Sequence, residues 1–199
     1  MEDGATEAGS VNEVQRVGDT VHRPAGEWTD AVQSLLGFLE ERGVAGVPRA
    51  LGLDERGREV VSYLDGTVAR RPWPATMLSG SGVLDAARWL QQYLVAARDY
   101  PGPPEGFRFR DPASVCQPGE VVNHGDLGPW NMVFTAGGGD PTQQKFVGVI
   151  DWDLAQPGPP EMSIGQLLAN GNAAIRTTRC IIPYMGTPTS YDAPGGSRE

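Results

Sequence analysis

Three oxygen-bearing side chains in the second half of the chain are spaced as a site for a hard cation requires. Asp126 and Asn131 lie five residues apart, and Asp151 follows directly on the apolar run VGVI. A buried strand that ends in an acidic residue needs a cation or hydrogen bonds to compensate the charge. Carboxylate and amide oxygens suit Mg²⁺, which completes its coordination with water and phosphate. We therefore predict that Asp126, Asn131 and Asp151 converge on a site of the kind that binds Mg²⁺.

Two strands on either side of a glycine-rich loop would bring these groups together. Residues 131–135 and 146–150 have the apolar character of strands, and the segment AGGGDPTQQ lies between them. Such a pattern predicts an antiparallel hairpin. Because the loop is centred near Asp140, we expect Asn131 to lie opposite Asp151, with Asp126 in the loop that leads into the hairpin.

Further elements must hold this hairpin in place. Residues 11–21 read as a first hairpin with its turn at Gly18, and an amphipathic helix is expected over residues 28–42. Strands are expected over residues 44–53 and 59–64, so the first 65 residues read as β-β-α-β-β. The strongest helical pattern covers residues 83–98.

The combination of motifs resembles the aminoglycoside phosphotransferase family, which includes small-molecule kinases with the protein-kinase-like fold. The resemblance rests on His124-Gly125-Asp126, on Asn131, and on the run Ile150-Asp151-Trp152-Asp153. The spacing from Asp126 to Asn131 matches the catalytic loop of kinases. The resemblance implies an α+β fold with two lobes: a small, β-rich N-lobe and an incomplete, mainly α C-lobe whose β-hairpin carries the metal site.

The resemblance also implies roles for individual residues. Asp126 would accept or orient the proton of the substrate hydroxyl, and Asn131 and Asp151 would hold Mg²⁺ against the phosphates of ATP. Adenine would bind the backbone of the segment between the lobes, which contains Ser62, Tyr63 and Leu64.

Other residues near these motifs are expected to have supporting roles. Asp153 is either a further contact to the metal or a helix N-cap. His124 is expected to be structural, packed and hydrogen-bonded near the metal-binding aspartate. Trp130 and Trp152 are expected to wall the site.

One departure from the family pattern concerns the lysine that binds the α- and β-phosphates in kinases. Lys145 is the single lysine of the chain, and it lies beside the hairpin loop, in the wrong lobe. We predict that Arg23 takes over the phosphate contact; a solvated surface arginine is the alternative. The glutamate that pairs with this cation is undetermined, because Glu40 and Glu41 both lie near the end of the predicted helix.

The second departure concerns the end of the chain. We expect an N-lobe over residues 1–66, a C-lobe over residues 67–160 and an atypical, largely disordered tail over residues 161–199. The tail does not resemble the helices with which the family continues. We expect one weak helix near residues 162–170 and little contribution of the tail to the core.

The leading hypothesis is an ATP-dependent phosphotransferase that acts on the hydroxyl of a small molecule. The alternatives are an inactive relative that still binds Mg-nucleotide, a pure binding module, and a metal-dependent phosphohydrolase, which the presence of only 2 histidines disfavours. The net charge of −9 argues against a nucleic-acid partner. No apolar run is long enough for a membrane span and no signal peptide is visible, so we expect a cytoplasmic protein. The acceptor and the oligomeric state stay open.

Overall fold

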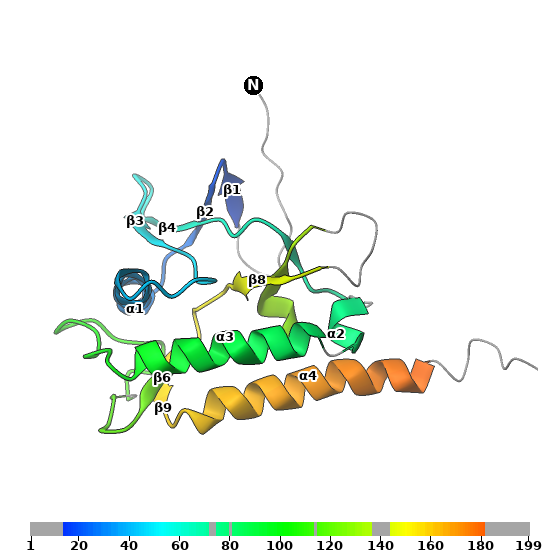
Figure 1. Ribbon diagram of the computed structural model, residues 1–199. Coiled ribbons are helices and arrows are strands. Elements are labelled where there is room, and N and C mark those ends of the chain that lie inside the picture. Colours follow the sequence, from blue (N-terminus) through cyan, green and yellow to red (C-terminus); the bar gives the residue numbers. More distant parts are fainter. Residues whose placement is uncertain (1–13, 72–74, 80, 114, 137–143, 182–199) are drawn as a thin grey trace, which may run out of the picture.

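The N-terminal part of the computed structural model is an antiparallel sheet covered by one helix (Figure 1). The structure describes residues 14–71, 75–79, 81–113, 115–136 and 144–181. The sheet has the order β1-β2-β4-β3. Its elements are β1 (Gln15–Val17), β2 (Thr20–Pro24), α1 (Thr29–Glu41), β3 (Ala50–Leu53) and β4 (Arg58–Ser62).

Local sequence signals explain the start of this sheet and the limits of its helix. Gly18 has φ 59° in the turn between β1 and β2, and Gly43 has φ 69° just beyond α1. Both conformations lie in the left-handed region that glycine adopts without a steric cost. The buried residues of α1 recur at helical spacing and face the sheet: Ala31, Val32, Leu35, Leu36 and Leu39.

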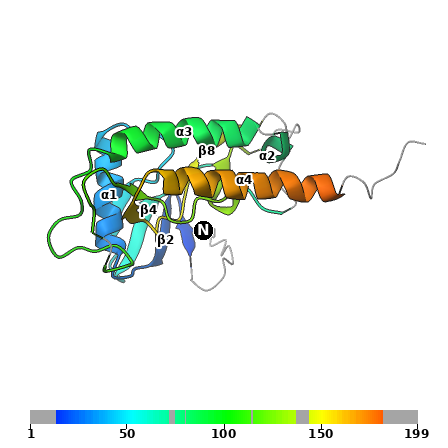
Figure 2. The same cartoon turned by 90° about the horizontal axis from the view of Figure 1, so that it is seen from below.

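The C-terminal part consists of two small sheets and two long helices. Sheets β5-β7-β8 and β6-β9 are antiparallel. Helices α3 and α4 lie side by side (Figures 1 and 2), with β8 above them and β6 and β9 at their left ends in Figure 1. The elements are β5 (Thr67–Val68), α2 (Ala75–Ser79), α3 (Ser81–Ala97), β6 (Val121–Asn123), η1 (Pro129–Asn131), β7 (Met132–Phe134), β8 (Phe146–Val149), β9 (Gln156–Gly158) and α4 (Glu161–Ile181). No helix in the described part of the chain combines the length and hydrophobicity of a membrane span.

One hydrophobic core runs through both parts of the molecule. Trp89 and Tyr93 of α3 stack with 5.5 Å between ring centroids, and Trp152 packs against Tyr93 at 5.4 Å. The Trp152 side chain is 1% exposed, so it belongs to the core and does not wall a site. Because Trp152 lies between Asp151 and Asp153, its burial fixes the backbone that carries both carboxylates.

The α+β class predicted from the sequence is confirmed, and so is the hairpin of β7 and β8. The predicted register is wrong by one residue. Met132 pairs with Val149, and the amide of Ile150 donates to the carbonyl oxygen of Asn131 at 2.9 Å. Ile150, not Asp151, therefore lies opposite Asn131. The pairing shifts between Val133 and Phe134, and a register inferred from loop length alone does not foresee such an irregularity.

Helix α4 is longer than the weak helix expected near residues 162–170, and its first half contributes to the core. Leu167 is 3% exposed, and the buried Ser163 hydroxyl donates to Oδ1 of Asn123 at 2.7 Å. The expectation of a negligible contribution is therefore wrong for this half. The packed face mixes polar and apolar residues, so a search for apolar periodicity missed it. The irregular chain that we expect after about residue 183 lies outside the described residues.

Candidate active site

The segment that joins β6 to β7, residues 124–131, carries the His-Gly-Asp motif and is called the HGD loop below. Gly125 has φ 84°, and a Cβ atom at this position would lie 1.8 Å from the carbonyl oxygen of Leu154. Glycine is therefore required at residue 125 by both conformation and space. The close approach brings the loop against the segment that carries Asp151 and Asp153.

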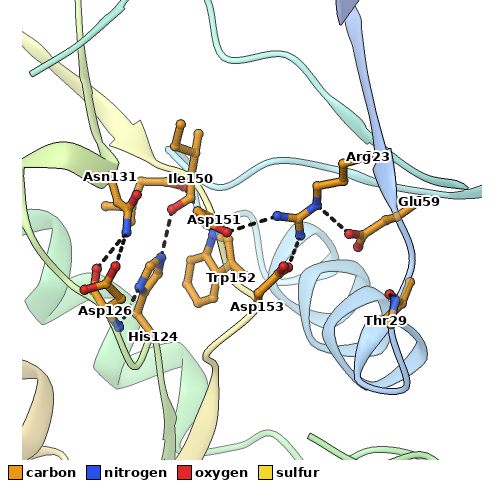
Figure 3. A network of polar contacts seen from close by, with 12 residues as sticks. Arg23, Thr29, Glu59, His124, Asp126, Asn131, Ile150, Asp151, Trp152 and Asp153 are labelled. Atoms are coloured by element: carbon orange, nitrogen blue, oxygen red, sulfur yellow. Dashed lines mark hydrogen bonds and ion pairs between the residues drawn. The ribbon is translucent and has the colours of Figure 1, made fainter. Parts of the chain in front are cut away.

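The carboxylate of Asp126 accepts hydrogen bonds at one of its two oxygens, and Figure 3 shows the contact with Asn131. Its Oδ2 accepts hydrogen bonds from Nδ2 of Asn131 and from Nε1 of Trp130, each at 2.9 Å. Nδ2 of Asn131 also donates to the main-chain oxygen of Asp126 at 2.9 Å. No donor of the described residues reaches Oδ1, so one carboxylate oxygen stays free to accept a proton or a hydrogen bond.

Helix α4 holds the HGD loop from outside through main-chain atoms. Gln166 donates from Nε2 to the carbonyl oxygen of Gly125 at 2.7 Å and accepts from the amide of Leu127 at 3.3 Å. Asn170 donates to the carbonyl oxygen of Leu127 at 3.0 Å. Sequence reasoning missed both residues. The signal that could have found them is their spacing of four, which places both amides on one face of a helix.

His124 is a neutral, structural residue, as expected. Its Nε2 donates to the carbonyl oxygen of Ile150 at 3.0 Å, and its Nδ1 accepts from the amide of Asp126 at 3.3 Å. An imidazole that accepts at Nδ1 is unprotonated there, so these contacts assign the Nε2–H tautomer. Burial lowers the pKa of His124 to about 4, although the Ile150 carbonyl and nearby aspartates favour the cation.

The buried imidazole predicts that the protein loses stability in mild acid. The unfolded chain binds a proton at His124 below the ordinary pKa of about 6.5, whereas the folded protein resists protonation down to about 4. The stabilisation is therefore complete above pH 6.5 and falls as the pH drops towards 4, by roughly 2–3 kcal/mol for this one group. Urea unfolding at pH 7.5 and pH 4.5 measures the change. His124→Gln should remove this component and His22→Gln should retain it; equal pH dependence in wild type and His124→Gln would contradict the assignment.

Arg23 of β2 connects the N-terminal sheet to the two aspartates (Figure 3). Its Nε lies 2.6 Å from Oε2 of Glu59, its Nη1 lies 3.1 Å from Oδ1 of Asp151, and its Nη2 lies 2.7 Å from Oδ1 of Asp153. The Arg23 side chain is 13% exposed. The alternative of a solvated surface arginine is therefore wrong.

The carboxylates around Arg23 outnumber its single positive charge. Burial by itself would lower the pKa of Arg23, but Glu59, Asp153 and Asp151 together raise the pKa above its usual value. The pKa of Asp153 is also raised, chiefly by burial. One guanidinium thus faces three carboxylates, of which Glu59 is 1% exposed. The cluster has an excess of negative charge, which a cation would compensate.

The glutamate partner of Arg23 comes from a strand and not from the helix. Glu59 lies directly opposite Arg23 in the antiparallel pair of β2 and β4. Helix α1 contributes Gln33 instead, whose Nε2 donates to Oε1 of Glu59 at 2.8 Å. Glu40 and Glu41 are exposed near the end of α1. The signal that sequence reasoning overlooked is the register in which β2 (TVHRP) pairs with β4 (REVVS).

Asp151 and Asp153 are placed by an unusual backbone conformation. Asp151 has φ 67°, the only positive φ of a non-glycine residue among those described. Such a conformation is uncommon outside glycine and concentrates at functional sites. The turn that follows is closed by a bond from the amide of Ala155 to the carbonyl oxygen of Trp152, and β9 comes next. Because no helix begins here, the N-cap alternative for Asp153 is wrong.

The structure does not bring Asn131 and Asp151 together as a preformed metal pair. Figure 3 shows the amide of Asn131 directed at Asp126 and the carboxylate of Asp151 directed at Arg23. In the described part of the chain, no three His, Cys, Asp or Glu side chains form a metal cluster. The donor set nevertheless fits Mg²⁺, because Oδ1 of Asn131 has no donor among the described residues and the Asp151 side chain is 54% exposed. Mg²⁺ needs few protein ligands when phosphates complete its shell.

The segment expected to bind adenine lies at the end of β4. The amide of Ser62 donates to the carbonyl oxygen of Arg49 at 3.0 Å, and the amide of Tyr63 donates to that of Asp19 at 2.8 Å. These two amides are engaged within the sheet. The amide of Leu64 has no partner in the described residues.

The second half of the chain is similar to a known protein family. Residues 109–186, which include the HGD loop and both aspartates, match the model of the phosphotransferase enzyme family. The resemblance inferred from the motifs is confirmed. The trifolitoxin immunity protein of Rhizobium leguminosarum bv. trifolii is 34% identical over 158 residues, which cover 77% of this chain and 56% of the relative. The chain thus spans about half the length of this relative.

Solved structures extend the likeness to the whole fold. Aminoglycoside phosphotransferase APH(3'')-Id from Streptomyces rimosus is similar with a TM-score of 0.56 and 18% identity, over 90% of this chain and 80% of that one. A choline/ethanolamine kinase family protein from Mesorhizobium loti is similar with a TM-score of 0.53 and 17% identity, over 92% and 70%. The kinase-like fold predicted from the sequence is therefore confirmed.

Proposed function

We propose that this protein is an ATP-dependent phosphotransferase that acts on the hydroxyl group of a small molecule. The observation that carries the proposal is the carboxylate of Asp126, whose Oδ2 accepts hydrogen bonds from Asn131 and Trp130, while no donor of the described residues reaches Oδ1. A fixed carboxylate with one open oxygen is suited to take the proton of an attacking hydroxyl.

The nucleotide part of the proposal draws on the surroundings of Arg23. The solved structures similar to this chain include APH(3'')-Id with ADP and streptomycin, and a mutant of aminoglycoside phosphotransferase APH(4)-Ia with ADP and hygromycin B. We propose that ATP binds here with its phosphates near Arg23 and its adenine near Leu64. Asn131 and Asp151 would hold Mg²⁺, which neutralises phosphate charge when bound. Such a reaction belongs in the cytoplasm, where ATP is available.

The reaction is a transfer between two oxygens. The acceptor hydroxyl forms a new O–P bond to the γ-phosphorus while the bond from that phosphorus to the bridging oxygen of ADP breaks. Asp126 takes the hydroxyl proton on Oδ1. Arg23 keeps its positive charge throughout, and it can exchange the carboxylates of Asp151 and Asp153 for phosphate oxygens because an arginine fork binds both kinds of group.

An inactive relative that binds Mg-nucleotide is the second candidate. It is favoured by one observation: three carboxylates already surround Arg23, so phosphate must compete with ion pairs of 2.6–3.1 Å. Both candidates require Mg-nucleotide binding, and only the first requires turnover. Release of ADP from Mg-ATP in the presence of streptomycin, hygromycin B or ethanolamine separates them.

Asp151→Ala is expected to abolish the Mg²⁺-dependent stabilisation by ATP. The neutral oxygen of Asn131 cannot hold the ion alone, because carboxylate charge dominates the binding of Mg²⁺. In the wild type, ATP at 100 times its Kd should add about 2.7 kcal/mol to the free energy of unfolding. Thermal denaturation with ATP, with and without Mg²⁺, measures this gain. Asp85→Ala on α3, which removes an exposed carboxylate paired with Arg88, is the matched control. An undiminished Mg-ATP shift in Asp151→Ala would refute the metal assignment.

A further inference from the structure

Trp130 lies in the HGD loop at a position to which the family motif assigns no role. Its indole is 43% exposed, which is unusual for so large an apolar side chain. Its Nε1–H nevertheless donates to Oδ2 of Asp126 at 2.9 Å. An exposed indole N–H can donate to water instead. The local geometry must therefore explain why the acceptor is the Asp126 carboxylate.

The loop is built to hold the indole ring in this place. Gly128 has an extended backbone with φ −127°, so its conformation does not require glycine. A Cβ atom at residue 128, however, would lie 2.4 Å from Cζ2 of Trp130. The ring therefore lies directly over the backbone of Gly128. Pro129 opens the short helix η1 with a fixed φ, and the missing side chain of Gly128 leaves room for the indole.

Two donors hold the carboxylate of Asp126 at the same oxygen. Nδ2 of Asn131 carries two hydrogens and donates both to Oδ2 and to the main-chain oxygen of Asp126. Nε1 of Trp130 has the single partner Oδ2. A carboxylate can rotate about its last bond through a broad range of angles. With the indole in place, rotation breaks two hydrogen bonds at the same oxygen.

We propose that Trp130 is a positioning residue: its indole N–H fixes the rotation of the Asp126 carboxylate so that Oδ1 alone is presented to the acceptor hydroxyl. The proposal rests on the proposed function for its catalytic consequence, whereas the hydrogen bond itself is independent of that function. The indole acts through Asp126 and needs no contact with the substrate.

The first arm of the test observes the indole directly. In a ¹H–¹⁵N spectrum of the protein, Trp130→Phe identifies the indole signal of Trp130 by its loss. Asp126→Ala should shift this signal and speed its exchange with water at least tenfold, whereas Asp126→Asn, which keeps an oxygen acceptor, should change it far less. The indoles of Trp89 and Trp152 donate to the carbonyl oxygens of Ala45 and Val149, so their unchanged signals report an intact fold. An indole signal of Trp130 that is the same in wild type and Asp126→Ala overturns the proposal.

The second arm measures turnover with Mg-ATP and streptomycin, hygromycin B or ethanolamine as probe acceptors. Trp130→Phe keeps the ring and loses the donor. It should lower kcat about 10- to 100-fold and leave the KM for ATP within twofold, since misplacement of a reacting group reduces the rate of the chemical step. An unchanged kcat overturns the positioning role. If the wild type turns over none of the acceptors, the proposed function fails, and the spectroscopic arm still decides whether the indole fixes the carboxylate.

Discussion

Asp126→Asn is expected to lower the rate of phosphotransfer by about 10²- to 10⁴-fold and to leave the affinity for Mg-nucleotide unchanged. The substitution replaces Oδ1, which has no donor among the described residues, by an NH₂ group that cannot accept a proton. The amide oxygen can still accept from Trp130 and Asn131, which bond Oδ2 in the wild type. The substitution therefore removes the proton acceptor but keeps the hydrogen bonds that hold the HGD loop. Coupled detection of ADP measures the rate, and thermal shift measures the nucleotide affinity.

Asp111→Asn is a useful control for Asp126→Asn, because Asp111 lies on the surface in the long segment between α3 and β6. Its turnover should equal that of the wild type. A variant Asp126→Asn with wild-type turnover would remove this carboxylate from the mechanism. A variant that loses Mg-nucleotide binding together with turnover would instead show that Asp126 acts on the nucleotide.

Arg23→Met is expected to destabilise the folded protein by about 3–5 kcal/mol. The substitution preserves the aliphatic stem and leaves Glu59 buried without its cation, and a buried charge that loses its partner is costly. Gln33 would still donate one hydrogen bond to Glu59, but a neutral donor does not compensate the charge. Urea denaturation at pH 7.5 gives the free energy of unfolding.

A double variant separates the charge effect from a packing defect. Arg23→Met with Glu59→Gln removes the unpaired charge and should recover at least half of the lost stability, so the two effects should be strongly non-additive. Arg88→Met serves as the control, because the Arg88 side chain is 72% exposed and its ion pair with Asp85 contributes little. Additive effects of Arg23→Met and Glu59→Gln would show that the two groups are not coupled in the folded protein.

The parts of the site that are set by local spacing could be predicted from the sequence. The short helix η1 brings Asn131 back to Asp126, and an apolar strand delivers the chain to Asp151. Both placements depend on residues that are close in sequence, so the spacing within the motifs is enough to predict them. The fold class was implied by the family that these motifs resemble, so it too depended on local spacing.

The parts that depend on long-range pairing could not be predicted in the same way. The partner of Arg23 is Glu59 because two strands far apart in sequence meet in a particular register. The register of β7 and β8 depends on an irregularity between Val133 and Phe134, which leaves no mark in the residue types. The role of α4 was hidden because its inner face is partly polar: Gln166 and Asn170 bind main-chain atoms, and apolar periodicity does not report such contacts.

The contacts of α4 also determine when, during synthesis, the HGD loop acquires its shape. Gly125 and Gln166, which the hydrogen bond joins, are separated by 41 positions in the chain. A ribosome therefore finishes the motif well before it has made the helix that binds the carbonyl oxygens of Gly125 and Leu127. Until residue 170 has emerged and α4 has docked, the nascent chain contains every acidic residue of the site but lacks the scaffold that orients them. The site is completed only after α4 has been synthesised, and a nascent chain that stops short of α4 would carry the family motif without its geometry.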